Sequence, residues 1–180
     1  MRILNIVLGD AVGGRWKVLL DHAQVLTERG HSVTTVIHKR ERERTHSGLT
    51  ISGDLVYLNN HRHFDLIATV KAMGLLHRTD PDIIIAHCSR SIALMKRATR
   101  GRLPVVCVMH SLNPKRCLKA DAFINITHCI EERLKAEGAA GKPHFLVPNM
   151  LPDSQPYLPP ERPYQQPVHL GAIGRDRKSV

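Results

Sequence analysis

Aromatic residues are scarce in this chain and make up only 4% of its 180 residues. Ile, Leu, Val and Ala must therefore fill the core, which favours layered α/β packing over an aromatic-rich β-sandwich. The hydrophobic content of 42% is enough for a packed core and argues against global disorder.

Long apolar runs and paired cysteines are also missing. No segment reaches the roughly 18 consecutive apolar residues that a membrane-spanning helix needs. The apolar start, residues 1–8, meets Asp10 without a small-residue cleavage site, which indicates a strand and not a signal peptide. The four cysteines form no CxxC pair, and we interpret them as buried free thiols of a reducing compartment. We therefore expect a soluble, cytoplasmic protein.

Acidic residues are outnumbered, and they are absent from residues 83–120. The net charge is +10 and the sequence pI about 9.9. Such a surplus predicts an anionic partner, either a phosphorylated small molecule or an acidic membrane surface. Nucleic acid is not expected, because the acid-free stretch has no aromatic side chains to stack on bases. The cations of this stretch are Arg90, Lys96, Arg97, Arg100, Arg102, Lys115, Arg116 and Lys119.

What the chain does have is a regular alternation of short apolar runs with amphipathic segments. The first run, residues 2–8, is followed by a glycine turn and by helical spacing up to Gly30, and residues 32–37 form a β-branched run. This βαβ pattern repeats and predicts an α/β fold, a Rossmann-like doubly wound parallel sheet. The further predicted strands are 55–58, 82–87, 105–109, 121–126 and 144–147, and the further predicted helices are 64–77, 92–99 and one from Thr127 to Gly138.

Ligands of such sheets bind at the carboxyl ends of the strands, where the sequence places Gly13 and Gly14. Glycines there let a phosphate approach the N-terminus of the following helix, although a tight turn alone would also explain them. The turn is not GxGxxG, and the second strand does not end in Asp or Glu. An NAD site is therefore not expected, and NADP stays an alternative.

Two histidines, His87 and His110, end neighbouring strands. His110 could hydrogen-bond a sugar hydroxyl or donate to a developing charge, and a purely structural role is the alternative. The pair lacks the spacing of metal ligands, so we expect no metal site. The basic residues Arg90, Lys96, Arg97, Lys115 and Arg116 follow strand ends, and we expect them on the same rim, facing an acceptor or a membrane.

The C-terminal part changes character after Met150. Prolines crowd residues 152–167, and residues 168–175 have the pattern of a strand with a glycine turn, followed by further cations. We predict a domain over 1–151, a proline-rich linker over 152–167, and the start of a second, donor-binding domain over 168–180. On this reading the chain alone is inactive.

The order and spacing of these motifs resemble the N-terminal, acceptor-binding half of a GT-B glycosyltransferase of the retaining family 4. No single motif is diagnostic, but together they cover nearly the whole chain. The matching segments are Gly13-Gly14, Glu28-Arg29-Gly30-His31, Pro81-Asp82-Ile83-Ile84-Ile85-Ala86-His87, Pro104-Val105-Val106-Cys107-Val108-Met109-His110, Ala120-Asp121-Ala122-Phe123-Ile124-Asn125-Ile126-Thr127, Val147-Pro148-Asn149 and Gly171-Ala172-Ile173-Gly174-Arg175.

The resemblance implies an enzyme that transfers a sugar from a nucleotide-sugar, a substrate and not a cofactor, to a glycan or lipid-linked acceptor with retention of configuration. It implies no metal. His110 would act as the catalytic residue that contacts the donor sugar, and Gly13, Gly14, Arg175 and Lys178 would bind the donor phosphates. Lys178 departs from the family pattern, which has a longer spacer and Lys-Gly after the Gly-Arg.

The resemblance also gives the basic surplus a meaning. Some members of the family act on cell-envelope glycans such as lipopolysaccharide, and a basic N-terminal domain would make the protein peripheral at the inner face of the membrane. Two alternatives remain open at this point. One is a self-contained Rossmann-like module for NADP or another phosphorylated ligand, and the other is a basic membrane-surface domain without chemistry.

Overall fold

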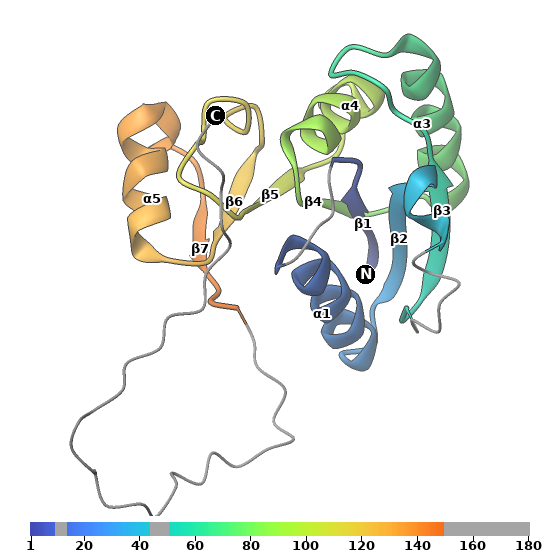
Figure 1. Ribbon diagram of the computed structural model, residues 1–180, viewed down its shortest axis with the longest axis horizontal. Helices are drawn as coiled ribbons and strands as arrows, with labels where there is room; N and C mark the ends of the chain where they lie inside the picture. The colour runs from blue at the N-terminus through green and yellow to red at the C-terminus, as the bar shows by residue number, and fades with distance from the viewer. Residues whose placement is uncertain (10–13, 44–50, 150–180) are drawn as a thin grey trace, which may run out of the picture. The chain divides into compact units, whose positions relative to one another are not determined.

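The computed structural model describes residues 1–9, 14–43 and 51–149. In these ranges seven strands form one parallel sheet in the order β3-β2-β1-β4-β5-β6-β7 (Figure 1). Parallel pairing of this kind needs long crossover connections between the strands, and several of them here contain the helices that the alternating sequence pattern predicted. The strands are β1 (Arg2–Val7), β2 (Ser32–His38), β3 (Asp54–Leu58), β4 (Ile83–Ala86), β5 (Val105–Met109), β6 (Ala122–Asn125) and β7 (His144–Leu146).

Helices cover both faces of the sheet. Helix α1 (Gly14–Glu28) lies against one face, while α3 (Leu66–Thr79), α4 (Ser89–Thr99) and α5 (His128–Leu134) belong to the core cluster on the other face (Figure 1). Two short turns, η1 (Lys39–Glu41) and η2 (Lys135–Ala139), directly follow β2 and α5 respectively. The predicted Rossmann-like doubly wound architecture is confirmed.

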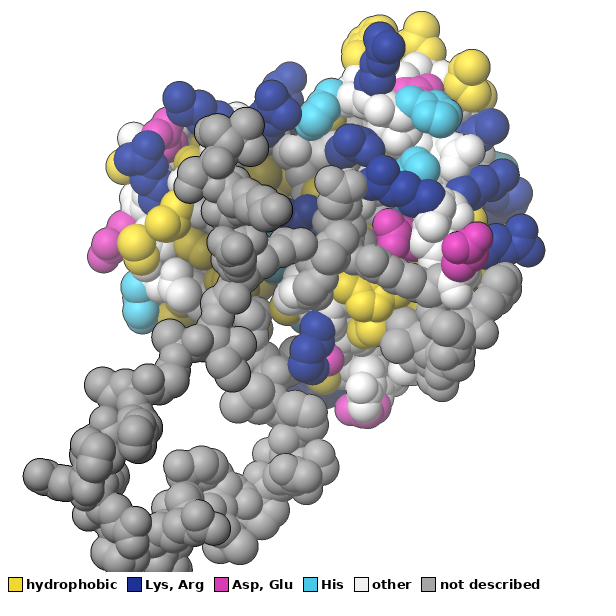
Figure 2. Space-filling view, in the orientation of Figure 1, with side chains coloured by type: hydrophobic (Ala, Val, Ile, Leu, Met, Phe, Trp, Pro, Cys, Tyr) yellow, Lys and Arg dark blue, Asp and Glu magenta, His cyan; other side chains and the backbone are white. Residues whose placement is uncertain are grey.

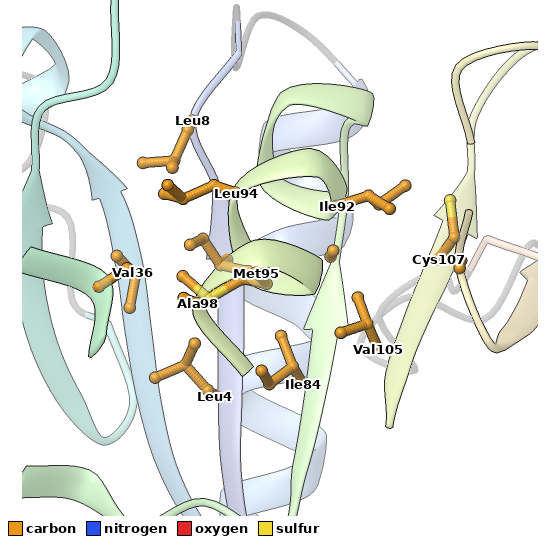
Figure 3. Packing of buried hydrophobic residues seen from close by; sticks show 14 of the residues in the cluster. Leu4, Leu8, Val36, Ile84, Ile92, Leu94, Met95, Ala98, Val105 and Cys107 are labelled. Carbon is orange, nitrogen blue, oxygen red and sulfur yellow. The ribbon is translucent and has the colours of Figure 1, made fainter. Parts of the chain in front are cut away.

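The central strand β1 shows why these residues form a sheet covered on both sides. Its side chains alternate between the faces: Leu4 and Ile6 pack in the α3–α4–α5 cluster, and Val7 packs with Leu19 of α1. In Figure 3 Met95 of α4 lies among apolar side chains of the neighbouring strands. These residues are buried, so the core rests on aliphatic side chains as the composition required.

Capping residues fix the helix ends and correct two predicted boundaries. Helix α3 begins at Leu66 and not at residue 64, because the Asp65 carboxylate accepts a hydrogen bond from the N–H of Ala68 at 2.9 Å. Helix α4 begins at Ser89, three residues before the predicted start, because Cys88 occupies the N-cap. The earlier start of α4 places Ser89 and Arg90 in the helix's first turn, beside the carboxyl end of β4.

Two other predicted ends are confirmed. Gly30 follows α1 with a φ of 80°, which a residue without a side chain adopts at no steric cost. Its N–H and that of His31 donate to the carbonyls of Thr27 and Leu26 respectively, closing the helix in a Schellman motif. Thr127 caps α5 by accepting from the N–H of Ile130.

The interpretation of the cysteines as buried thiols is right for Cys107 only. All four are free, but Cys88 and Cys117 are half-buried and Cys129 is exposed. The physical reason is position, since Cys88 and Cys117 border the cavity described below and Cys129 lies in the first turn of α5.

Residues 150–180, with the predicted linker and the start of a second domain, lie outside the described residues, so that division stays a prediction. Within the described ranges, no helix has the length and apolar character needed to cross a membrane.

Candidate functional site

The direction of strand succession reverses at β1, which has β2 on one side and β4 on the other. In a doubly wound sheet a crevice forms at this switch point, outside the carboxyl ends of the strands. The crevice is present here as a cavity of about 600 Å³. Its lining residues are Gly9, Arg15, His63, His87, Cys88, Ser89, Arg90, Val108, Met109, His110, Ser111, Asn113, Lys115, Arg116 and Cys117.

A chain of polar side chains leads from the centre of the sheet to this cavity. The side-chain N–H of Asn5, in β1, donates to the carbonyl of Leu19 at 2.9 Å. Oδ1 of Asn5 lies 2.7 Å from Nε2 of His87, and Nδ1 of His87 lies 3.3 Å from Nε2 of His110. Asn5 and His87 are 0% and 1% exposed, so these hydrogen bonds form away from water.

His87 and His110, the two histidines in this series of hydrogen bonds, are both neutral at pH 7. Burial, with smaller effects of the neighbouring His22, His110 and Arg15, lowers the pKa of His87 well below 6.5. Burial and the charge of Arg15 lower the pKa of His110 to about 4. An imidazolium would be poorly solvated there and repelled by a fixed cation.

Cations line the same cavity. Arg15 comes from the first turn of α1, Arg90 from the first turn of α4, and Lys115 and Arg116 from the segment after β5. Arg90 also donates to the carbonyl of Leu8 at 3.3 Å, which holds it at the end of β1. The arrangement suits an anion, since it joins cations to the positive end of a helix dipole.

His63 belongs to the same group. Its Nε2 lies 3.2 Å from the hydroxyl of Ser89, and it lines the cavity. Desolvation and the charges of Arg116, Arg90 and Arg97 lower its pKa. That three arginines act on one imidazole shows how closely positive charge converges at this rim. Figure 2 shows the same feature, with Lys and Arg side chains gathered around histidines on this face.

The structure describes Gly14 of the predicted Gly13-Gly14 pair. Gly14 is the first residue of α1, and a Cβ built on it would meet no atom within 4 Å, so no protein contact requires a glycine there. Gly13 lies outside the described residues. Gly9 lines the cavity, and a Cβ there would stand 3.3 Å from Sγ of Cys88, which is a tight contact.

Of the five predicted rim cations, the structure brings three to the cavity, namely Arg90, Lys115 and Arg116. The expectation that Lys96 shares this rim is wrong, because its Nζ pairs at 2.7 Å with the carboxylate of Asp121. Asp121 directly precedes β6 and so lies at the amino ends of the strands, away from the cavity. Arg97 instead packs against α3, with its guanidinium 5.2 Å from the centre of the Phe64 ring. Lys96 lies on a different side of α4 from Arg90, whereas Arg97 lies on the same side about two turns further along the helix.

Sequence reasoning missed Asn5, Arg15 and His63. Asn5 could have been noticed as the one amide in the apolar run 3–8, and Arg15 as a cation directly after a glycine turn. Nothing in the local sequence marks His63. The predicted donor-phosphate residues Arg175 and Lys178 lie outside the described residues. Among the described residues no group of three or more His, Cys, Asp and Glu side chains is placed to hold a metal ion.

The switch-point cavity and the seven-stranded sheet define a Rossmann-like ligand-binding domain. The model of the Glycosyltransferase Family 4 matches residues 12–155. The chain therefore belongs to this glycosyltransferase family. No curated protein matches its sequence significantly.

Solved structures share the fold. The lipopolysaccharide outer core galactosyltransferase WaaB in its apo form has a TM-score of 0.64 at 15% identity, over 84% of this chain and 46% of that one. Anabaena Alr3699/HepE in complex with UDP and glucose has a TM-score of 0.62 at 18% identity, over 84% and 45%. MurG from Acinetobacter baumannii has a TM-score of 0.52 at 14% identity, over 71% and 42%.

The chain thus spans less than half the length of these structures. At such identities the likeness shows the fold alone. It confirms the predicted fold class, the Rossmann-like half of a GT-B arrangement.

Proposed function

We propose that this chain forms the acceptor-binding domain of a retaining glycosyltransferase, which transfers a sugar from a nucleotide-sugar to a glycan or lipid-linked acceptor. The observation that carries the proposal is the cavity at the switch point, which is lined by neutral His110 and by cations that include Arg15 and Arg90. A ligand that combines hydroxyl groups with phosphate matches both the histidine and the cations of such a site.

The cations and His110 have different roles in this reaction. Negative charge develops on the diphosphate as it leaves the sugar, and fixed cations that meet this charge stabilise the transition state. Arg15 and Arg90 would serve that end, together with the residues predicted to bind the donor phosphates, Gly13, Gly14, Arg175 and Lys178. His110 would contact the donor sugar. Lys115 and Arg116 would bind a phosphate on the acceptor. In this proposal the nucleotide-sugar is a substrate, and neither a metal ion nor a cofactor takes part.

The family membership and two of the similar structures support the choice of substrates. Alr3699/HepE was solved with UDP and glucose, and WaaB is named for a lipopolysaccharide outer core. A UDP-sugar donor and a cell-envelope acceptor are therefore the first substrates to test.

The test is transfer by the protein encoded by the whole reading frame that contains this chain. It would be incubated with radiolabelled UDP-glucose, UDP-galactose or UDP-N-acetylglucosamine and with envelope lipid and lipopolysaccharide extracts, with and without EDTA. We expect one donor to label the extract, with EDTA without effect, and the anomeric NMR signal of the product to match that of the donor. Absence of transfer from every donor would contradict the proposal.

The double variant Lys115→Glu, Arg116→Glu is expected to lower kcat/KM for transfer about a hundredfold, because each hydrogen bond lost between a charged side chain and the acceptor phosphate contributes about 1.5 kcal/mol or more. The control is Arg29→Glu, an exposed residue just after α1 at the other edge of the sheet. The control should leave kcat/KM unchanged. Equal activity of the two variants would show that the rim does not bind a reacting anion.

The surface of α3 supports a membrane-bound acceptor. Phe64, Leu66, Ile67 and Val70 are all between 64% and 70% exposed, and Figure 2 shows hydrophobic side chains exposed near α3. Arg97 places a cation beside these apolar side chains, with its guanidinium 5.2 Å from the centre of the Phe64 ring. Apolar side chains beside cations match an anionic bilayer, where the former enter the acyl boundary and the latter bind lipid phosphates. We propose peripheral binding of the chain at such a surface.

Flotation with vesicles of phosphatidylglycerol and phosphatidylcholine tests this binding. The variant Ile67→Glu, Val70→Glu is expected to bind at least about tenfold more weakly, since burying each aliphatic side chain contributes about 1.5 kcal/mol or more. Gln24→Glu, an exposed residue on α1, is the control and should bind as the wild type does. Wild-type protein that stays unbound at low salt would contradict peripheral binding.

A further inference from the structure

We propose that Asn5 and His87 are positioning residues that fix the tautomer of His110, so that His110 presents Nδ1 to the cavity as a hydrogen-bond acceptor. The inference deepens the proposed function and rests on it in one respect, namely that the group donating to Nδ1 is a hydroxyl of the bound sugar. The tautomer itself follows from the hydrogen bonds and from the neutrality of the two rings, without reference to a substrate.

The chain of hydrogen bonds begins at a group that can only accept. The carbonyl oxygen of Leu19 lies 2.9 Å from the side-chain nitrogen of Asn5, so this end of the amide must be its NH₂ group. Exchanging the amide oxygen and nitrogen would bring two acceptors together in a site that is 0% exposed. Oδ1 of Asn5 is therefore directed at His87.

His87 carries its proton on Nε2. Oδ1 of Asn5 accepts and cannot donate, and it lies 2.7 Å from Nε2 of His87, which must supply the N–H. His87 is 1% exposed and neutral, so it holds one ring proton only. Its Nδ1 is consequently unprotonated and accepts a hydrogen bond.

The position of the ring proton of His110 follows in the same way. Nδ1 of His87 lies 3.3 Å from Nε2 of His110, and the planes of the two rings differ by only 25°. The bond forms when Nε2 of His110 carries a proton. Because His110 is also neutral at pH 7, its Nδ1 then holds a lone pair. None of the hydrogen bonds found among the described residues engages this Nδ1, and His110 lines the cavity.

The consequence is a choice between the two roles that the sequence left to His110. A neutral imidazole with a lone pair toward the ligand accepts from a sugar hydroxyl. It does not donate to a phosphate oxygen or to a developing negative charge. Phosphate recognition then falls to the cations that line the same cavity, and His110 selects for a hydroxyl at one position of the sugar.

The first test needs no activity. The 180-residue chain with ¹⁵N-labelled histidine is studied by NMR at pH 7, where protonated and unprotonated ring nitrogens resonate in well-separated regions. We expect Nε2 protonated and Nδ1 unprotonated for both His87 and His110. A proton on Nδ1 of His110, alone or together with one on Nε2, would overturn the assignment.

Two variants test whether Asn5 and His87 cause this tautomer. His87→Phe removes the acceptor, and His110 should then become a mixture of both tautomers. Asn5→Asp favours a charged His87 whose Nδ1–H donates, which should shift the proton of His110 to Nδ1. His22→Phe is the matched control, because its ring lies 5.3 Å from His87 without belonging to the hydrogen-bond chain. A His110 tautomer unchanged in a folded His87→Phe or Asn5→Asp variant would overturn the positioning role.

The hydroxyl is tested with UDP-glucose and UDP as probes on the protein of the whole reading frame. We expect UDP-glucose, but not UDP, to shift the Nδ1 resonance of His110 in the direction of hydrogen bonding. Bound UDP-glucose that leaves Nδ1 unaffected would overturn the acceptor role. Failure of every nucleotide-sugar to bind would contradict the proposed function, while the tautomers measured on the 180-residue chain would still decide the positioning role of Asn5 and His87.

Discussion

Lowering the pH from 7 to 5 is expected to reduce the free energy of unfolding by about 2 kcal/mol through His110 alone, and by about 3 kcal/mol at pH 4. The unfolded chain takes up a proton on this residue near pH 6.5, whereas burial and Arg15 lower the pKa of the folded protein's His110 to about 4. Between these values the unfolded state binds more protons, so acid favours unfolding. His87 acts in the same direction, since burial lowers its pKa well below 6.5.

The pH range of this loss of stability distinguishes the effect of the histidines from that of the carboxylates. Hydrogen bonds from the backbone N–H groups of Ala68 and Arg2 lower the pKa values of Asp65 and Asp82 below the usual 3.8. Their stabilising effect is present above that value and is lost only in stronger acid. The pH range from 5 to 7 therefore reports mainly on buried imidazoles.

Urea denaturation followed by circular dichroism at pH 5, 6, 7 and 8 measures the effect. The wild type should lose stability from pH 7 to 5 and change little from pH 7 to 8. His110→Gln should show a shallower dependence between pH 5 and 7, because one of the responsible groups is gone. Stability that stays constant from pH 7 to 5 would contradict the neutral histidines of the cavity.

Replacing Phe123 with alanine is expected to destabilise the protein by about 3–5 kcal/mol, the usual cost of truncating a fully buried phenylalanine. Phe123 of β6 is 0% exposed and belongs to the core cluster that includes Ile130 and Leu134 of α5. Its ring also lies over that of His144 in β7, with the centroids 5.2 Å apart. The cavity left by the substitution would loosen α5 and β7 together, because the same side chain contacts both.

The neighbouring strand offers the control. Phe145 of β7 pairs in register with Ile124, beside Phe123, but is 55% exposed. Phe145→Ala should change the free energy of unfolding by less than about 1 kcal/mol, as surface substitutions do. Urea midpoints of the two variants at pH 7 give the comparison. Equal losses would mean that the packing around Phe123 is not what holds this end of the sheet.

Much of the fold is predictable because its signals are local. A continuous apolar run such as residues 83–86 identifies a strand covered on both faces without knowledge of its neighbours. Gly30 and Thr127 end and begin helices through their own backbone and side-chain chemistry. The order of such elements is enough to indicate a parallel, doubly wound sheet, and the motifs at their ends indicate the family.

The prediction of the site was less complete, because a residue's place in the sequence after a strand does not determine which groups its side chain contacts. Lys96 and Arg90 lie six residues apart in one helix, yet Lys96 reaches Asp121 at the amino ends of the strands and Arg90 lines the cavity at their carboxyl ends. A helix 11 residues long runs from the carboxyl to the amino ends of the strands that it covers, so the turn that carries a cation decides which partner it meets.

The sequence by itself therefore determined the alternating elements, the glycosyltransferase family, the basic character and the position of His110 at a strand end. Only the tertiary structure decided which groups surround that histidine. Asn5 and His87 are separated by 82 residues, and they meet because β1 and β4 pair in register at the switch point. The sheet also buries them, and burial makes the histidines neutral and each hydrogen bond directional. Strand pairing and desolvation are properties of the folded chain as a whole, which no local pattern of residues can express.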